Sequence, residues 1–271
     1  MVDSLHTAIL AAQAGGRVLA ERAGDPLSVR AKRWTNDLVT EVDIEAGVAV
    51  VEALLAAYPT ASIIIEEDEV YALTGTTPGL IDDETVWIID PLDGTTSFVH
   101  GYPCYSVSVA YAERGTVVAG AVHNAALAET FSAARGHGAH LDGRPISASA
   151  AADLTEALLI TGFPYDRGAP LERQLKVLSA FLRGYVHGIR RDGSAANDCC
   201  YVAAGRADGF WEYYLKPWDM AAGALIAEEA GCLVTDVTGE PWSLLAEGIC
   251  IASPTLHAKM IEVILAAGGA E

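Results

Sequence analysis

Hydrophobic and polar positions follow one rhythm in the first half of the chain. Residues 5–22 and 42–57 carry apolar side chains at helical spacing. Short β-branched runs follow, in "SIIIEEDE" and in residues 86–90, and both run directly into acids. Alternating runs then flank residues 113–115, and this spacing predicts a hairpin of two paired strands. Further short strands are expected after it, separated by Gly-rich turns. The pattern predicts two helices on a largely antiparallel sheet.

The rhythm changes from about Asp153 to strands and helices in alternation. Strands are expected in "EALLITGF", "YVHGIRR" and "ADGFWEYY", and helices at residues 171–183, after Gly193, and at residues 217–230. The fold class is therefore α/β, with an α+β N-terminal half at residues 1–150 and an α/β C-terminal half at residues 151–271. We see no fixed repeat and no low-complexity linker, so the halves are expected to form one compact unit.

Composition narrows the class of protein without identifying it. The 271 residues are 51% hydrophobic and 20% charged, as in a globular protein. No apolar run reaches the roughly 18 residues that a membrane span requires, and the N-terminus lacks the cationic start of a secretory signal. Five cysteines without a C-x-x-C pair argue against a disulfide framework or a structural zinc, so we expect reduced, partly buried thiols. A cytoplasmic location is expected.

The formal net charge of -19 changes the picture of possible partners. Nucleic acids and anionic membranes are bound through Lys and Arg, so neither is an expected partner. An anionic small molecule would need local positive charge, from metal ions or from backbone amides.

Candidate chemistry is densest in "WIIDPLDGTTSF", residues 87–98. A buried strand ends at Asp90, Pro91 restricts the turn, Gly94 permits close backbone approach, and a helix can start at the following threonines. Two carboxylates would then lie beside the free backbone amides at the start of a helix. The carboxylates could bind a metal ion, and the amides could bind a phosphate. The alternative is an ordinary polar turn that closes a buried strand.

Further acids stand at the ends of other predicted elements. Glu66 and Glu67 follow a strand, and Asp219 starts a helix in "KPWDMAAG". Each acid alone is typical of a turn, a cap or a solvated strand end. Together, oxygen ligands without a His or Cys cluster favour Mg²⁺, Mn²⁺ or Ca²⁺.

Five segments in order resemble the inositol monophosphatase family of magnesium-dependent, lithium-sensitive phosphatases. They are "KRWTNDLVTEVD", "EEDE", "WIIDPLDGTTSFVHGYP", "GIRRDGSAANDCCYVAAGRADGFWE" and "KPWDMAAGALIAEEAG". The resemblance implies a layered αβαβα sandwich of the inositol monophosphatase and fructose-1,6-bisphosphatase type, and a homodimer. Two departures are Ile65, where the family usually has glycine, and Ser97, where it usually has asparagine.

The resemblance also implies a role for each matching position. Two or three Mg²⁺ ions, with Mn²⁺ as a substitute, would bind to carboxylates and one carbonyl. Ile65 in place of glycine could alter the backbone path and so the position of Glu66, on which the third ion depends. The phosphate would lie on backbone amides, a hydroxyl–carboxylate pair would help activate water, and a lysine would lie on a mobile loop nearby. The metal ligands would be Glu66, Asp90, Leu92, Asp93 and Asp219; the catalytic residues Thr95, Asp43 and Glu66; and the substrate-binding residues Gly94, Thr95, Gly193, Ser194, Ala195, Glu212, Asp219 and Lys32.

The implied reaction is Mg²⁺-dependent hydrolysis of a small phosphate monoester of a polyol, with inositol 1-phosphate as the preferred substrate. Water would attack directly, without a covalent intermediate. Fructose-1,6-bisphosphatase, histidinol-phosphatase and 3'-phosphoadenosine-5'-phosphate phosphatase remain alternatives on the same fold. A non-catalytic binding or regulatory protein that retains the fold is the alternative of another class.

Overall fold

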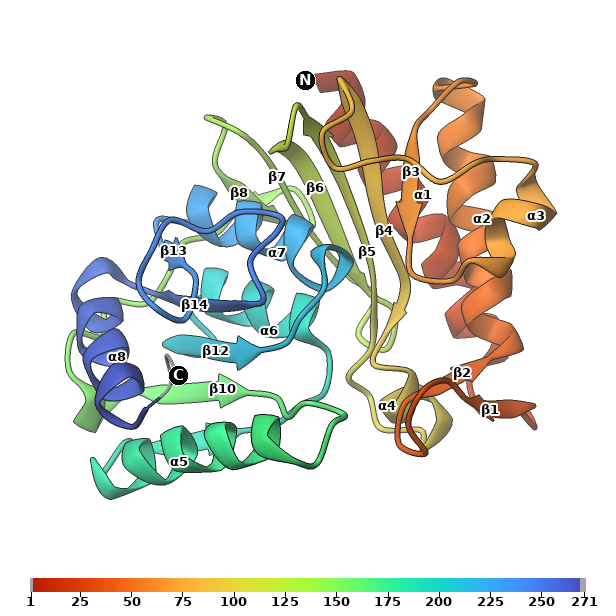
Figure 1. Cartoon of the computed structure of the whole chain (residues 1–271). Helices are drawn as coiled ribbons and strands as arrows, with labels where there is room; N and C mark the ends of the chain where they lie inside the picture. Colours follow the sequence, from red (N-terminus) through yellow and green to blue (C-terminus); the bar gives the residue numbers. More distant parts are fainter. Residues whose placement is uncertain (1, 269–271) are drawn as a thin grey trace.

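The computed structural model describes residues 2–268 and stacks helices and sheets in five alternating layers (Figure 1). Helices α1 and α2 cover one face of a seven-stranded sheet, and α6 and α7 lie between this sheet and a five-stranded one. Helices α5 and α8 cover the outer face of the second sheet. This is the layered αβαβα sandwich that the resemblance implied.

The seven-stranded sheet has the strand order β3-β4-β5-β6-β7-β8-β9. It is antiparallel throughout except for the β3–β4 pair, as the alternating pattern predicted for the first half. A separate two-stranded hairpin, β1–β2, precedes it. The strands are β1 (Val29–Ala31), β2 (Leu38–Thr40), β3 (Ile63–Ile65), β4 (Thr85–Asp93), β5 (Ser106–Glu113), β6 (Thr116–Asn124), β7 (Glu129–Ala134), β8 (Ala139–Leu141) and β9 (Arg144–Pro145).

The five-stranded sheet has the order β11-β10-β12-β14-β13, with β10 parallel to both of its neighbours and β14 antiparallel to both of its own. The pattern assigned no elements after residue 230, where the structure has β13, β14 and α8. The strands are β10 (Leu158–Thr161), β11 (Gly188–Arg190), β12 (Gly209–Tyr213), β13 (Leu233–Thr235) and β14 (Gly248–Ala252).

The helices confirm the predicted segments to within a few residues. The 17-residue α2 begins after Thr40, whose hydroxyl accepts a hydrogen bond from the Val42 amide. No helix within residues 2–268 is both long enough and apolar enough to cross a membrane. The helices are α1 (Val2–Arg22), α2 (Glu41–Ala57), α3 (Glu69–Thr74), α4 (Thr95–Val99), α5 (Ala169–Arg183), α6 (Ala195–Ala203), α7 (Pro217–Glu229) and α8 (Pro254–Ala266), with a 3₁₀ turn at Leu154–Glu156.

Strand β4 is apolar on both faces because each face packs into a different core. Val86 and Ile88 face the core between the two sheets, whereas Trp87 and Ile89 face the core beneath α1 and α2. All four side chains are at most 1% exposed. A strand buried on both sides has little freedom to shift, so its carboxyl end is a rigid support for a site.

Helix α7 is buried on nearly every side, and small residues allow this. A Cβ atom on Gly223 would lie 2.6 Å from the Cβ of Cys199 on α6. On the opposite side, a Cβ atom on Gly120 of β6 would lie 3.0 Å from the Cα of Ala222. Helix α7 therefore packs closely against α6 on one side and against β6 on the other. This close packing fixes the position of the start of α7.

The five cysteines are all buried and unpaired, as expected from the sequence. Burial raises the pKa of the Cys199 and Cys200 thiols well above the ordinary value. These thiols therefore serve as small apolar side chains of the core.

Gly120→Val tests the close approach of β6 and α7. The added side chain meets helix backbone that cannot move aside, so we expect a loss of about 1–3 kcal/mol in the free energy of unfolding, seen as a lower urea midpoint. Thr116→Val, at an exposed position of the same strand, should change the free energy by less than about 0.5 kcal/mol. Equal midpoints for the two variants would contradict this account of the packing.

Candidate active site

A cavity of about 610 Å³ lies where β4, β12 and the starts of α4 and α7 meet the β1–β2 hairpin. Figure 1 shows α4 below the end of β4 and beside the β1–β2 hairpin. The cavity brings together most of the residues that the sequence predicted for a site. Those that line it are Lys32, Glu66, Asp90, Leu92, Asp93, Gly94, Thr95, Gly193, Ala195, Glu212 and Asp219.

The turn after β4 has the shape that its sequence predicted. The pairing with β5 shifts register between Asp90 and Asp93, and the Leu92 amide donates to Asp90 Oδ1 at 3.0 Å. Gly94 then adopts φ 99°, where a Cβ atom would lie 2.9 Å from the Cys104 carbonyl oxygen. Glycine is therefore required here, and α4 begins directly after it.

Asp43 lies behind the cavity wall and supports Thr95. The Thr95 hydroxyl donates to Asp43 Oδ1 at 2.8 Å. The other carboxylate oxygen of Asp43 accepts from the amide of Thr40 at 2.8 Å and from its hydroxyl at 2.6 Å. Burial raises the pKa of Asp43, and these hydrogen bonds oppose that shift. The pair is thus fixed in orientation, with Thr95 facing the cavity.

Ser194 differs from the expectation that it faces the alcohol. Its side chain is fully buried and does not line the cavity. Its hydroxyl donates to Asp93 Oδ2 at 2.7 Å, and the Ala196 amide donates to the same oxygen at 2.7 Å. The side chain of Ser194 therefore orients Asp93, because α6 packs against the end of β4.

Three of the acids repel one another. Burial is the main cause that raises the pKa of Asp93, to about 6, and that raises the pKa of Asp90 and of Asp219 well above the ordinary value. The charges of the neighbouring acids, Glu66 among them, raise all three further. A divalent cation would relieve this repulsion.

Lys32 already supplies one positive charge at this place. The β1–β2 connection brings the Lys32 ammonium to Glu66 Oε1 at 2.7 Å, and the ammonium also contacts Glu67. Burial by itself would lower the pKa of Lys32, but the two carboxylates raise it. Burial also raises the pKa of Glu67 to about 7.

Ile65 does not displace Glu66 from the sheet. Ile65 is 3% exposed and packs in the core beneath α2, next to Gly47. The Glu66 amide continues the ladder by donating to the Ile89 carbonyl oxygen at 3.2 Å. The glutamate therefore leaves the end of β3 beside the end of β4.

The donor set fits a hard cation, although within residues 2–268 no three His, Cys, Asp or Glu side chains are already arranged around one point as a metal ion would require. Glu66 is turned to Lys32, and Asp93 is held by α6. Carboxylate oxygens, a main-chain carbonyl and space for water are the donors that Mg²⁺ and Mn²⁺ prefer. The individual metal ligands stay predictions.

Glu212 lies on β12 and also lines the cavity. It lies against Gly162, where a Cβ atom would come within 2.0 Å of its carboxylate. Burial raises the pKa of Glu212 to about 8, and the positive charge of Arg191 opposes the shift. At neutral pH the carboxyl group can therefore both donate and accept hydrogen bonds, as binding a hydroxyl requires.

Several contributing residues were not singled out from the sequence. Thr40 was identified from the sequence only as the residue before a helix. Its T-x-x-D pattern is a capping-box signature, and this could have indicated that its hydroxyl lies beside Asp43. Gly162 and Tyr165 enter the cavity from the loop after β10, and no local pattern marks them. Their role depends on contacts between segments far apart in sequence.

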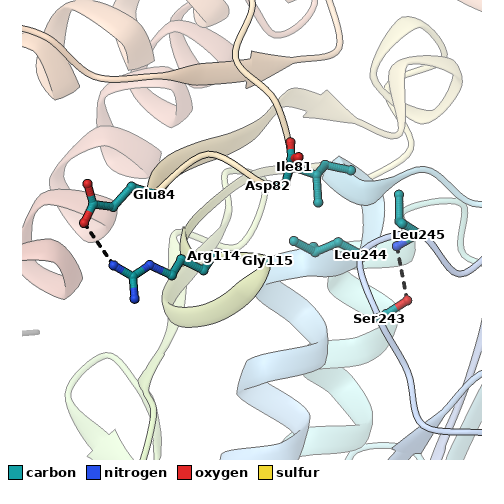
Figure 2. A pocket seen from close by; sticks show the side chains of 8 residues that line it. All are labelled: Ile81, Asp82, Glu84, Arg114, Gly115, Ser243, Leu244 and Leu245. Atoms are coloured by element: carbon teal, nitrogen blue, oxygen red, sulfur yellow. Dashed lines mark hydrogen bonds and ion pairs between the residues drawn. The ribbon is translucent and has the colours of Figure 1, made fainter.

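A second hollow, of about 690 Å³, lies near the other end of β4 (Figure 2). Figure 2 shows Leu244 and Leu245 opposite Ile81, with an ion pair between Glu84 and Arg114 at the edge. Both partners of this pair are about four-fifths exposed. The hollow is wide and mostly apolar, without the buried acids of the first cavity, so it is the weaker candidate for chemistry.

Comparison with known proteins agrees with the resemblance over the whole chain. The model of the "Inositol monophosphatase family" matches residues 2–267. The chain belongs to the inositol monophosphatase family.

Relatives in this family carry names of two kinds. A "Putative Nus factor SuhB" of Neisseria meningitidis serogroup B is 40% identical, with 97% of this chain and 98% of that protein covered. "Phosphatase IMPL1, chloroplastic" of Arabidopsis thaliana is 38% identical, with 96% of this chain and 69% of that protein covered. The solved structure of an inositol monophosphatase (IMPase) of Thermotoga maritima is 33% identical, with a TM-score of 0.88 and 98% of each chain covered.

Asp93→Asn tests the repulsion among the acids of this family member. A carboxyl group whose pKa is raised in the folded state binds protons more readily there than in the unfolded chain, so its cost in stability grows as the pH rises from the unfolded pKa to the folded pKa. In EDTA at pH 8 we expect the variant to be more stable than the parent by about 1–2 kcal/mol. The difference should shrink as the pH falls below about 6, the folded pKa of Asp93, and disappear near the ordinary Asp pKa of about 4. Thermal melting measures both.

The same melting curves with Mg²⁺ provide the control. The parent should gain stability as Mg²⁺ is added, because binding to the folded state alone shifts the equilibrium, and Asp93→Asn should gain much less. Asp82→Asn, an exposed acid outside the cavity, should behave like the parent. A parent protein insensitive to both EDTA and Mg²⁺ would contradict the cation site.

Proposed function

We propose that this protein is a Mg²⁺-dependent phosphatase that hydrolyses phosphate monoesters of polyols, with inositol 1-phosphate as the preferred substrate. The observation that carries the proposal is the content of one cavity. Glu66, Asp90, Asp93 and Asp219 line it together with Thr95, which is hydrogen-bonded to Asp43. Acids that repel one another would be stabilised by bound cations. The backbone amides of the turn at Gly94 would bind the phosphate of an anionic ester.

The cation would be held by Glu66, Asp90, Asp93 and Asp219 and by the Leu92 carbonyl. Bound Mg²⁺ lowers the pKa of water and offsets the charge of the leaving oxygen. The protein supplies the framework for this chemistry: β4 is rigid, Ser194 and Ala196 orient Asp93, and the amide of Lys216 donates to Asp219 Oδ2 at 2.7 Å.

Proton transfer from the attacking water is supported by the Thr95–Asp43 pair. Thr95 Oγ1 can accept a hydrogen bond from water while it donates its own hydrogen to Asp43 Oδ1. Backbone amides of Gly94 and Thr95 would receive the phosphate at the start of α4. No side chain is required as a covalent nucleophile.

The alcohol side supports a compact polyol. Glu212, Gly193 and Ala195 all line the cavity, and Glu212 lies against Gly162. A carboxyl group with a pKa of about 8 suits a substrate hydroxyl, which both donates and accepts hydrogen bonds. This chemistry favours an inositol ring over an apolar alcohol.

A substrate with a second phosphate stays among the candidates, because cations line the same cavity. Arg33, Arg191 and Lys216 do so in addition to Lys32, whereas Arg190 does not. Fructose 1,6-bisphosphate, 3'-phosphoadenosine 5'-phosphate and histidinol phosphate therefore belong in the substrate panel.

A binding or regulatory role is the alternative of another class, and the name Nus factor given to several relatives keeps it open. Turnover is favoured here because every acid of the family's predicted metal set, and the Thr95–Asp43 pair, is present. A protein selected only for binding would not need this buried repulsion.

Release of inorganic phosphate from inositol 1-phosphate, with and without Mg²⁺, tests the proposal. We expect release only with Mg²⁺ or Mn²⁺, and a fall of about 100-fold or more for Asp93→Asn. Asp82→Asn should retain parental turnover. The panel of phosphate esters at fixed Mg²⁺ then ranks the substrates, and no release from any ester by folded parent protein would refute the proposed activity.

A further inference from the structure

Tyr165 reaches the acid cavity from the C-terminal half of the chain. It lies in the loop between β10 and α5 and lines the cavity that Glu66, Asp93 and Asp219 also line. Within residues 2–268 its hydroxyl makes no hydrogen bond to another residue, while the side chain as a whole is 48% exposed. The phenol therefore brings an uncommitted donor to the wall of this cavity.

The electrostatic surroundings agree with this position. Burial of the phenol, followed by the charges of Glu66, Asp37, Asp219 and Asp93, raises the pKa of Tyr165. The hydroxyl thus stays protonated at neutral and mildly alkaline pH. It can donate a hydrogen bond beside Glu66, Asp93 and Asp219, whose ionised carboxylates can only accept.

The loop that carries Tyr165 is tied to the loop that carries Lys32. In one orientation of the Asn36 amide, its nitrogen lies 3.3 Å from the Tyr165 carbonyl oxygen. In the other orientation, its oxygen accepts from Arg167 Nε at 3.2 Å and from Arg167 Nη2 at 3.0 Å. Asn36 therefore links the two sides of the cavity at its rim.

A phosphate in this cavity needs donors on more than one side. The turn at Gly94 and Thr95 supplies backbone amides from the end of β4, and Lys32 is engaged by Glu66 and Glu67. Arg33, Arg191 and Lys216 also line the cavity, but the carboxylates beside the turn repel a phosphate unless cations intervene. A neutral hydroxyl donor from the opposite loop adds attraction without adding charge.

We propose that Tyr165 is a phosphate-binding residue whose hydroxyl donates a hydrogen bond to the phosphoryl group, and that Asn36 positions it by holding the Tyr165–Arg167 loop. The assignment rests on the proposed phosphatase function for the location of the phosphate. It names a contact with the phosphoryl group, which every phosphate ester shares, and not with the alcohol.

Tyr165→Phe tests the contact, because it removes only the hydroxyl. A lost hydrogen bond to a charged group predicts a rise of roughly 10- to 100-fold in the inhibition constant of inorganic phosphate with Mg²⁺ present. The KM should rise by a similar factor for inositol 1-phosphate, glycerol phosphate and p-nitrophenyl phosphate alike. Tyr185→Phe makes the same change at an 83% exposed tyrosine outside the cavity, and should leave every constant unchanged.

Asn36→Ala tests the positioning role through a double-mutant cycle. Alone it should weaken phosphate inhibition by several-fold, and in the Tyr165→Phe background it should have little further effect, because the hydroxyl it positions is gone. Additive losses would overturn the positioning role.

The remaining outcomes separate this inference from the proposed function. Losses confined to polyol esters, or parental constants for Tyr165→Phe in an active protein, would overturn the phosphate contact alone. If the parent releases no phosphate from any ester, calorimetry with inorganic phosphate and Mg²⁺ still decides the contact. A parent that neither turns over nor binds phosphate would overturn both.

Discussion

The repulsion among buried carboxylates at the end of β4 is the constraint on which the site depends. Asp90 and Asp93 leave one strand three residues apart, and Asp219 arrives from the start of α7. Burial and mutual repulsion raise the pKa of all three. A divalent cation bound among them would relieve this repulsion, which supports the proposed cation site.

The rest of the architecture can be understood as the support for that arrangement. Strand β4 is fixed because both of its faces are core, and α7 is fixed because Gly120 and Gly223 let its backbone approach β6 and α6. Helix α6 contributes Ser194 and Ala196 to the orientation of Asp93. Packing over the whole sandwich therefore determines where a few oxygen atoms lie, and an error in packing far from the cavity would move them.

The sequence predicted what is encoded locally. The turn at Asp90–Gly94 could be predicted because proline, glycine and the two acids lie within five residues. The layered fold was predicted from the resemblance of five segments to a known family. The elements β13, β14 and α8 were not assigned, although their apolar runs are buried.

Contacts between distant segments were beyond the reach of the pattern. Nothing near Lys32 indicates that it bonds Glu66, nothing near Ser194 indicates that it turns inward to Asp93, and Tyr165 has no motif of its own. Lys32 acquires its role only when the β1–β2 hairpin packs beside the end of β3, and Ser194 and Tyr165 acquire theirs only when the C-terminal half packs against the N-terminal half. The shape of the alcohol side of the cavity also depends on contacts between distant segments. The reaction class is therefore better supported than the identity of the alcohol.

Proton release on metal binding tests the central claim most directly, because ligands with raised pKa values must lose protons to bind a cation. Calorimetric titration of Mg²⁺ into the metal-free protein at pH 6.5, in two buffers of different ionisation enthalpy, counts those protons. The account predicts release of about one proton or more per cavity, falling as the pH is raised. Tight Mg²⁺ binding with no proton release, or no binding at all, would contradict it.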